Sequence, residues 1–125
     1  MPTYNVFVYG SLKRGFHNHP LIEQQHVKPI FKGLDKIKGT MLNLGQFPAL
    51  VPGNTLVSGE VWEVSGTCMV DLDRLEGHPH IYQRYFHTLE SGEKAWVYFL
   101  SKSYHYTVRN SPVVKSGIWT HEDVA

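Results

Sequence analysis

Short runs of β-branched and aromatic residues recur along the chain, and turn residues separate them; this pattern constrains the fold more than any other feature. Residues 47–54 are typical of such a turn. The sequence therefore predicts an α+β fold built on a small, barrel-like mixed β-sheet of about six strands with few helices. The segments expected to form strands are residues 6–9, 37–44, 56–64, 82–89, 95–100 and, less regularly, a final one near 113–119.

The best helix candidate is residues 65–76, which precede Gly77 and, two residues later, Pro79. Glycine just beyond the last turn and proline soon after it are typical of a helix end. A second, shorter helix is expected over residues 19–25, with Asn18 as its N-cap. The longer helix has an apolar face formed by Cys68, Met69, Leu72 and Leu75.

Composition limits the classes of protein to which the chain can belong. With 125 residues, 42% hydrophobic and 18% charged, we expect one domain that spans residues 1–125. A net charge of +1 favours neither nucleic acid nor a membrane surface as a partner. The single cysteine excludes an internal disulfide bond and fits a reducing compartment. No signal peptide or long apolar segment is present, so a cytoplasmic monomer is expected.

The first predicted strand runs into Tyr9, Gly10, Ser11 and Leu12. Glycine adopts backbone torsion angles that other residues avoid, and such a turn can direct N–H groups toward a carboxylate or carbonyl oxygen. Ser11 adds a hydroxyl donor. The simpler interpretation is a tight turn that closes a buried strand. The two cations that follow, at positions 13 and 14, are expected to be solvated.

Glu76 lies on the apolar side of the predicted helix, at its last residue. An acid there is costly unless it is paired or used in chemistry. Both desolvation and the helix dipole should raise its pKa, which suits a group that accepts and returns a proton. The alternative is a glutamate at a frayed helix end that turns to water or pairs with Arg84. A pair with Arg84 would lower the pKa of the acid and weaken that role.

Other residues offer rival chemistry with weaker support. Glu60 and Glu63 are alternative carboxylates on a predicted strand. Cys68 falls on the apolar helix face, which favours a buried structural thiol over a nucleophile. The histidine pairs His17/His19 and His78/His80 have spacings that could hold a metal, but they lie in loop-like sequence without a third ligand. No metal site is therefore predicted.

The loop and the glutamate together resemble one family. Residues 6–15, VFVYGSLKRG, followed by Asn18-His19, are similar to the opening of the γ-glutamylamine cyclotransferases, within the γ-glutamyl cyclotransferase-like (AIG2-like) family. LDRLE, ending at Glu76, resembles the segment that carries the catalytic glutamate of that family. Further matches lie at residues 47–50, 59–62 and 95–98, so the resemblance covers most of the chain in the same order.

The resemblance implies a barrel-like α+β fold with a cavity at the end of the first strand. Tyr9, Gly10, Ser11 and Leu12 would bind the γ-glutamyl group, and Glu76 would be the acid/base. The implied reaction is an intramolecular aminolysis that releases 5-oxoproline and an amine from γ-glutamyl amines such as γ-glutamyl-ε-lysine, without a cofactor or metal. Ser11 stands where the γ-glutamylamine enzymes carry threonine, so the preferred leaving group of the substrate is not predicted. Two alternatives remain: a non-catalytic module that binds a small anion in the same cavity, and a protein-interaction domain.

Overall fold

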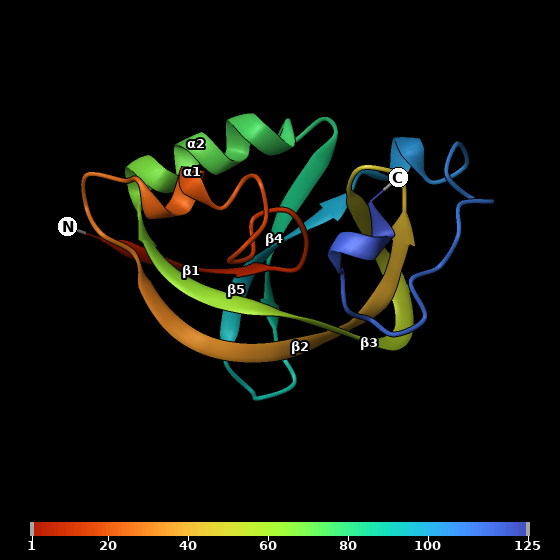
Figure 1. Cartoon of the computed structure of the whole chain (residues 1–125), viewed down its shortest axis with the longest axis horizontal. Coiled ribbons are helices and arrows are strands. Elements are labelled where there is room, and N and C mark those ends of the chain that lie inside the picture. The colour runs from red at the N-terminus through yellow and green to blue at the C-terminus, as the bar shows by residue number, and fades with distance from the viewer. Residues whose placement is uncertain (1, 125) are drawn as a thin grey trace.

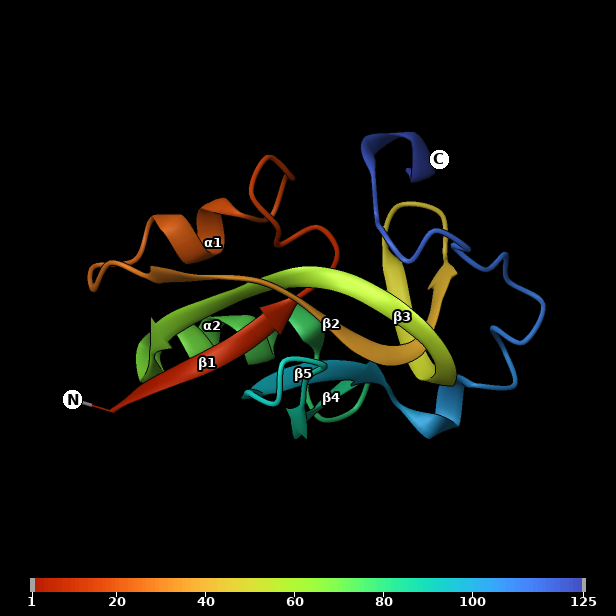
Figure 2. The same ribbon diagram turned by 90° about the horizontal axis from the view of Figure 1, so that it is seen from below.

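The computed structural model describes residues 2–124, and one curled five-stranded sheet runs through them in the order β2-β3-β1-β5-β4 (Figures 1 and 2). An α+β fold with a curled sheet and few helices is as predicted. The helices α1 and α2 lie together on one side of the sheet (Figure 1). The elements are β1 (Thr3–Val8), α1 (Pro20–Glu23), β2 (Ile30–Asn43), β3 (Pro48–Ser65), α2 (Gly66–Glu76), β4 (Tyr82–Thr88), β5 (Lys94–Leu100) and two 3₁₀ turns, Lys102–Tyr104 and His121–Asp123.

Strand β1 is central and is covered on both faces over its second half, which explains the apolar run of residues 6–8. It pairs antiparallel with β3 and parallel with β5. Because side chains alternate along a strand, Val6 and Val8 pack in the cluster that includes the α2 residues, whereas Phe7 and Tyr9 pack in a second cluster. The second cluster includes Trp119 from the C-terminal segment. The loop that follows β1 therefore begins between the two core clusters.

The long β2–β3 ladder corrects one prediction. Residues 47–54, predicted as a turn, mostly belong to β3, and the connection from β2 is shorter, at residues 44–47. The register shifts between Gly39 and Thr40, whose partners are Thr55 and Val51, so residues 52–54 form an irregularity within the strand. Proline and glycine favoured the turn interpretation, and here they mark the irregularity instead. Strand β2 also begins earlier than predicted, at Ile30.

The predicted sixth strand near residues 113–119 is wrong. Within residues 2–124, this segment makes one isolated bridge, between Leu42 and Val113. Its side chains are nevertheless used, because Val114 and Trp119 are buried in the second core cluster. Gly117 adopts a φ of 72°, in the left-handed region, which interrupts extended pairing. The apolar residues of the segment therefore reflect packing against the sheet rather than membership in it.

Helix α2 begins and ends as predicted. The Ser65 hydroxyl accepts a hydrogen bond from the Cys68 N–H at 3.2 Å, and Gly77 ends the helix in the left-handed conformation with φ of 64°. Helix α1 is shorter than predicted, and Asn18 does not cap it. His19 occupies the N-cap position, and its side chain makes no capping hydrogen bond to the helix. No helix in the described part of the chain is long and apolar enough to cross a bilayer.

Candidate active site

A cavity of about 330 Å³ opens at the end of β1, and the five residues expected to bind the substrate or act as the acid/base all line it. Tyr9, Gly10, Ser11 and Leu12 form one part of its wall, and Glu76 at the end of α2 forms another. Their common location follows from topology, because β1 and α2 both end at this side of the molecule (Figure 1). The other lining residues are Phe7, Val8, His17, Asn18, Gln46, Phe47, Pro48, Leu75, Ile81, Tyr82 and Tyr98.

Gly10 is required for space rather than for torsional freedom, which corrects the reason inferred from the sequence. Its φ does not lie in the positive range. A Cβ at this position would lie 2.6 Å from Cγ and 2.9 Å from Cδ of Pro48, closer than real Cβ atoms approach other atoms. Pro48 is buried at the start of β3. The glycine thus lets the loop lie directly against β3.

The loop presents two backbone donors. The Gly10 carbonyl accepts a hydrogen bond from the Lys13 N–H at 3.1 Å, and the Ser11 carbonyl accepts one from the Asn18 N–H at 3.0 Å. Both peptide bonds are trans, so the N–H groups of Ser11 and Leu12 point opposite to those carbonyls. Among residues 2–124 neither N–H donates a hydrogen bond. They are therefore available to an oxygen of a ligand in the cavity that both residues line.

Asn18 belongs to this loop, whereas the sequence suggested a helix cap. Its Nδ2 donates to the Ser11 hydroxyl oxygen at 2.9 Å, in addition to its N–H bond to the Ser11 carbonyl. The serine oxygen is thus held as an acceptor, and its own proton remains free to donate. An asparagine that follows a loop can cap the next helix or hydrogen-bond to the loop itself, and the sequence alone does not distinguish the two roles.

The Tyr9 side chain forms part of the cavity wall, and its hydroxyl is already hydrogen-bonded within the protein. Its phenolic O–H donates to the Tyr98 carbonyl at 2.7 Å. Burial, with Tyr82 and Glu76 nearby, raises the pKa of Tyr9 well above its usual value. The Tyr82 hydroxyl is similarly engaged, with the Pro48 carbonyl at 2.9 Å. These tyrosines close the inner side of the cavity without adding a charge.

The environment of Glu76 is the main chemical feature of the site. Burial raises the pKa of Glu76 from 4.5 to about 7, the direction expected from the sequence. Among the described residues no cation pairs with this carboxylate. One expected neighbour differs, because Leu75 is 44% exposed and lies at the cavity wall rather than in the buried stripe. A group with this pKa is present in both protonation states near neutral pH.

Arg84 pairs with Asp73 and not with Glu76. Its Nε and Nη2 donate to the two Asp73 carboxylate oxygens at 2.7 and 3.1 Å. The Tyr98 hydroxyl donates to the same carboxylate at 2.6 Å. Although burial acts to raise it, these hydrogen bonds lower the pKa of Asp73. Asp73 thereby engages the guanidinium that would otherwise lower the pKa of the acid in the cavity.

The rival residues lie elsewhere. Glu60 is buried but lies outside the cavity lining, and Glu63 lies 3.5 Å from Lys32 at the surface. Cys68 is fully buried, and burial raises its pKa to about 11, which leaves it a neutral thiol. Of the histidine pairs, His17 lines the cavity, and His78 accepts a hydrogen bond from the Arg84 N–H. No group of three or more metal-ligating side chains occurs within residues 2–124.

Several cavity residues carry no clear signal in the sequence. Gln46 is an exposed loop residue, and nothing in its neighbourhood marks it as part of a site. Ile81 is 46% exposed and follows the end of α2, where the sequence shows turn chemistry only. Tyr98 could be suspected as a pocket wall from its place on a strand. Its bond to Asp73, 25 positions away, depends on tertiary packing, which places Tyr98 in the same core cluster as the buried residues of α2.

Comparisons with known proteins identify the family of this chain. Residues 6–121 match a family described as "Gamma-glutamyl cyclotransferase, AIG2-like". The Escherichia coli "Gamma-glutamylcyclotransferase family protein YtfP" is 30% identical over 118 residues, which cover 94% of this chain and 97% of the relative. The rat "Gamma-glutamylaminecyclotransferase" is 33% identical over 94 residues, which cover 64% and 59%.

Solved structures extend the agreement to the fold. The crystal structure of an AIG2-like protein from Mus musculus superposes with a TM-score of 0.76 at 28% identity, over 90% of this chain and 86% of the other. The fold of this chain is thus shared with a solved AIG2-like protein. The chain belongs to the gamma-glutamyl cyclotransferase, AIG2-like family.

Proposed function

We propose that this protein is a γ-glutamylamine cyclotransferase, which releases 5-oxoproline and a free amine from γ-glutamyl amines such as γ-glutamyl-ε-lysine. The observation that carries the proposal is a carboxyl group with a pKa of about 7 in the same cavity as two unpaired backbone donors. The family supports a cyclotransferase, and the name of the rat relative supports amine leaving groups.

The reaction needs a proton acceptor that also returns the proton. The free α-amine of the substrate attacks its own γ-carbonyl carbon, and a C–N bond of the five-membered ring forms while ionised Glu76 takes a proton from the amine. The tetrahedral intermediate then breaks its bond to the leaving nitrogen, which receives the proton from Glu76. No net proton, water or electron is consumed. A pKa near the working pH suits a group with both duties.

The loop stabilises charge and orients the substrate. The N–H groups of Ser11 and Leu12 are placed to bind the developing oxyanion or the α-carboxylate of the substrate. One such donor contributes about 3 kcal/mol to transition-state stabilisation in other enzymes. Apolar and tyrosine side chains around Glu76 exclude water, which strengthens these hydrogen bonds. Holding the flexible γ-glutamyl chain so that amine and carbonyl meet supplies the remaining effect.

The direct test is a substrate screen. Purified protein is incubated with γ-glutamyl-ε-lysine, γ-glutamyl alkylamides and γ-glutamyl dipeptides, and 5-oxoproline is measured by chromatography. We expect 5-oxoproline in equal amount to the released amine, with the amine-type substrates preferred. Release of glutamate would indicate hydrolysis and contradict the proposal. Ligand binding without any product would favour the non-catalytic binding module instead.

The pH dependence of kcat/KM provides a second prediction. Burial raises the pKa of Glu76 to about 7, and the ionised form is the one that accepts the first proton. We therefore expect kcat/KM to fall about tenfold per pH unit below pH 7, since kcat/KM reports the free enzyme. Initial rates measured between pH 5 and 9 with γ-glutamyl-ε-lysine test this. A profile that stays flat down to pH 5 would contradict Glu76 as the base.

A further inference from the structure

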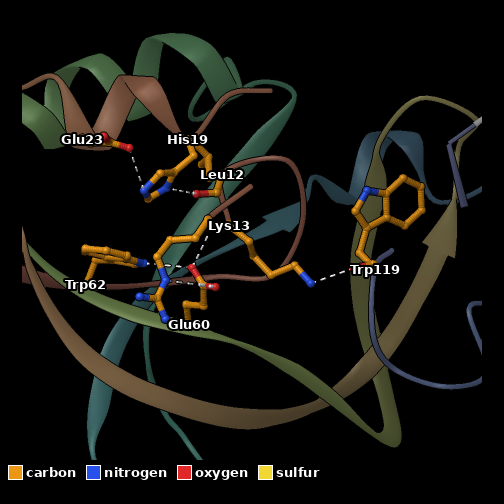
Figure 3. Close-up of polar contacts among 8 residues, drawn as sticks. Leu12, Lys13, His19, Glu23, Glu60, Trp62 and Trp119 are labelled. Atoms are coloured by element: carbon orange, nitrogen blue, oxygen red, sulfur yellow. Dashed lines mark hydrogen bonds and ion pairs between the residues drawn. The ribbon is translucent and has the colours of Figure 1, made fainter. Parts of the chain in front are cut away.

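The buried polar residues of this protein gather at one loop. Within residues 2–124, four polar or charged residues are buried, and one of them, Ser65, caps α2. The other three, Lys13, His19 and Glu60, all hold the segment that follows β1 (Figure 3). Burial of a polar group costs free energy unless it is hydrogen-bonded. Three such groups at one segment therefore indicate that its conformation matters.

Glu60 holds the loop from the sheet below it. Its Oε1 accepts hydrogen bonds from the Arg14 N–H at 3.0 Å and from the Trp62 indole N–H at 3.1 Å. Glu60 is 8% exposed and lies on β3, where it is paired with Val8 of β1. The Arg14 guanidinium covers the contact by stacking 4.1 Å above the Phe31 ring. The backbone at Arg14 is thus fixed to a rigid element.

His19 holds the same loop from the side of the helices. Its Nδ1 lies 2.8 Å from the Leu12 carbonyl oxygen, and because a carbonyl only accepts, Nδ1 carries the proton. The imidazole ring packs against Trp62 with a centroid separation of 5.1 Å. Figure 3 shows Trp62 beside both His19 and Glu60. The two contacts therefore share one rigid aromatic support.

Lys13 provides the third contact, toward the C-terminal segment. Its Nζ donates to the Trp119 carbonyl at 2.7 Å, so this residue is not solvated as the sequence suggested. Burial lowers the pKa of Lys13, an effect that nearby Glu60 opposes. The three contacts act on consecutive residues, Leu12, Lys13 and Arg14. The contacts thus begin at the Leu12 carbonyl, in the residue that carries the second of the two N–H donors.

We propose that Glu60 and His19 are positioning residues that hold the N–H groups of Ser11 and Leu12 in the geometry that binds the substrate oxyanion. Neither side chain lines the cavity, so both act through the backbone of the loop. The proposal rests on the proposed function, because it assigns these donors to a transition state. Donors that are fixed before the reaction stabilise charge without reorganisation, which is why such buried supports favour catalysis.

Matched substitutions separate the hydrogen bond from the packing. Glu60→Met removes the acceptor and keeps the length of the side chain, whereas Glu60→Gln keeps an oxygen that can accept from Arg14. His19→Phe removes the donor and keeps a ring against Trp62, whereas His19→Asn places a donor near the position of Nδ1. We expect kcat to fall 10- to 100-fold in the Met and Phe variants with KM changed less than threefold. The Gln and Asn variants should stay within about threefold of the parent.

A purely structural role would give a different result. In that case all four variants would lower the melting temperature in proportion to the lost contacts, and kcat of the folded protein would not change. Equal kcat in His19→Phe and the parent, measured well below the melting temperature, would overturn the proposal. If Glu60→Met does not fold, the comparison of His19→Phe with His19→Asn decides between a positioning role and a purely structural role.

Amide hydrogen exchange distinguishes this proposal from the proposed function. The Lys13 and Asn18 amides donate to the Gly10 and Ser11 carbonyls, which belong to the same peptide units as the two donors. Followed by NMR in the ligand-free protein, they should become at least tenfold less protected in His19→Phe but not in His19→Asn. Absence of turnover in the parent with every γ-glutamyl compound would refute the cyclotransferase assignment. The exchange result would still decide whether Glu60 and His19 order the loop, and unchanged protection in both Met and Phe variants would overturn that.

Discussion

Replacement of Glu76 by glutamine is expected to lower kcat by about 10²- to 10⁴-fold while the protein remains folded, because general acid–base catalysis typically contributes that much. Glutamine has nearly the same shape and keeps hydrogen-bonding capacity. It cannot accept the proton of the α-amine, and it has none of suitable pKa for the leaving nitrogen. Since proton transfer occurs only in the transition state, kcat and kcat/KM should fall together.

A matched control removes a carboxylate that lies away from the cavity. Glu63→Gln changes the same functional group on β3, where Glu63 contacts Lys32 at the surface. We expect turnover of this variant to be unchanged. Turnover by Glu76→Gln close to that of the parent, in a protein with an unchanged circular dichroism spectrum, would refute the assignment of Glu76.

The same substitution should stabilise the protein at high pH. Glu76 has a pKa of about 7 in the folded chain against the ordinary value of 4.5, so the folded state binds its proton more tightly than the unfolded state. Stability is therefore lost as pH rises from about 4.5 to 7, and the cost persists above pH 7 at no more than about 3 kcal/mol. Glu76→Gln should raise the melting temperature at pH 8 but not at pH 4. Equal differences at both values would contradict a buried, proton-binding Glu76.

Gly10→Ala is expected to lower kcat/KM by about 100-fold, the size of effect that a displacement of roughly 1 Å produces in an active site. The new methyl group would lie 2.6 Å from Pro48 Cγ, and a buried proline ring has little freedom to move. The loop must therefore shift away from β3. That movement displaces the Ser11 and Leu12 donors, which are the groups proposed to bind the oxyanion.

Removal of the proline ring should restore the loop. The double variant Gly10→Ala/Pro48→Ala deletes Cγ and Cδ, the two atoms that the methyl group would meet, and keeps the Pro48 carbonyl that accepts from Tyr82. We expect it to recover at least tenfold of the lost kcat/KM. Gly66→Ala is the control, since a Cβ there meets Tyr4 at an ordinary 3.5 Å. Failure of the double variant to recover would show that the contact with Pro48 is not the cause.

Elements with local signals were predictable from the sequence. The β4–β5 hairpin follows from two strand-like segments around a short polar turn, and the structure pairs Tyr82 with Leu100 through Thr88 with Lys94. Helix α2 follows from Ser65 at its start and Gly77 at its end. In each case the residues that decide the structure are neighbours in the chain, so their pattern carries the information.

Elements that depend on distant partners were not predictable. Residues 47–54 contain two prolines and a glycine, and only the opposite strand β2 shows that most of them extend β3. In residues 113–119, Val114 and Trp119 belong to the second core cluster, and apolar residues alone do not distinguish a covering segment from a strand. The Asn18 side chain likewise bonds to Ser11, seven residues earlier, rather than capping the helix that follows.

For the site, the sequence by itself determined which residues are candidates: an acid at the end of an apolar helix face and a Gly-Ser turn at the end of a buried strand. These are properties of the chain near Glu76 and Gly10, so no tertiary information is needed to see them. Only the tertiary structure decided what surrounds them. Arg84 pairs with Asp73 instead of Glu76, and Pro48 occupies the space beside Gly10. Desolvation and close contact depend on atoms distant in sequence, and therefore only folding sets the pKa of the acid and the direction of the donors.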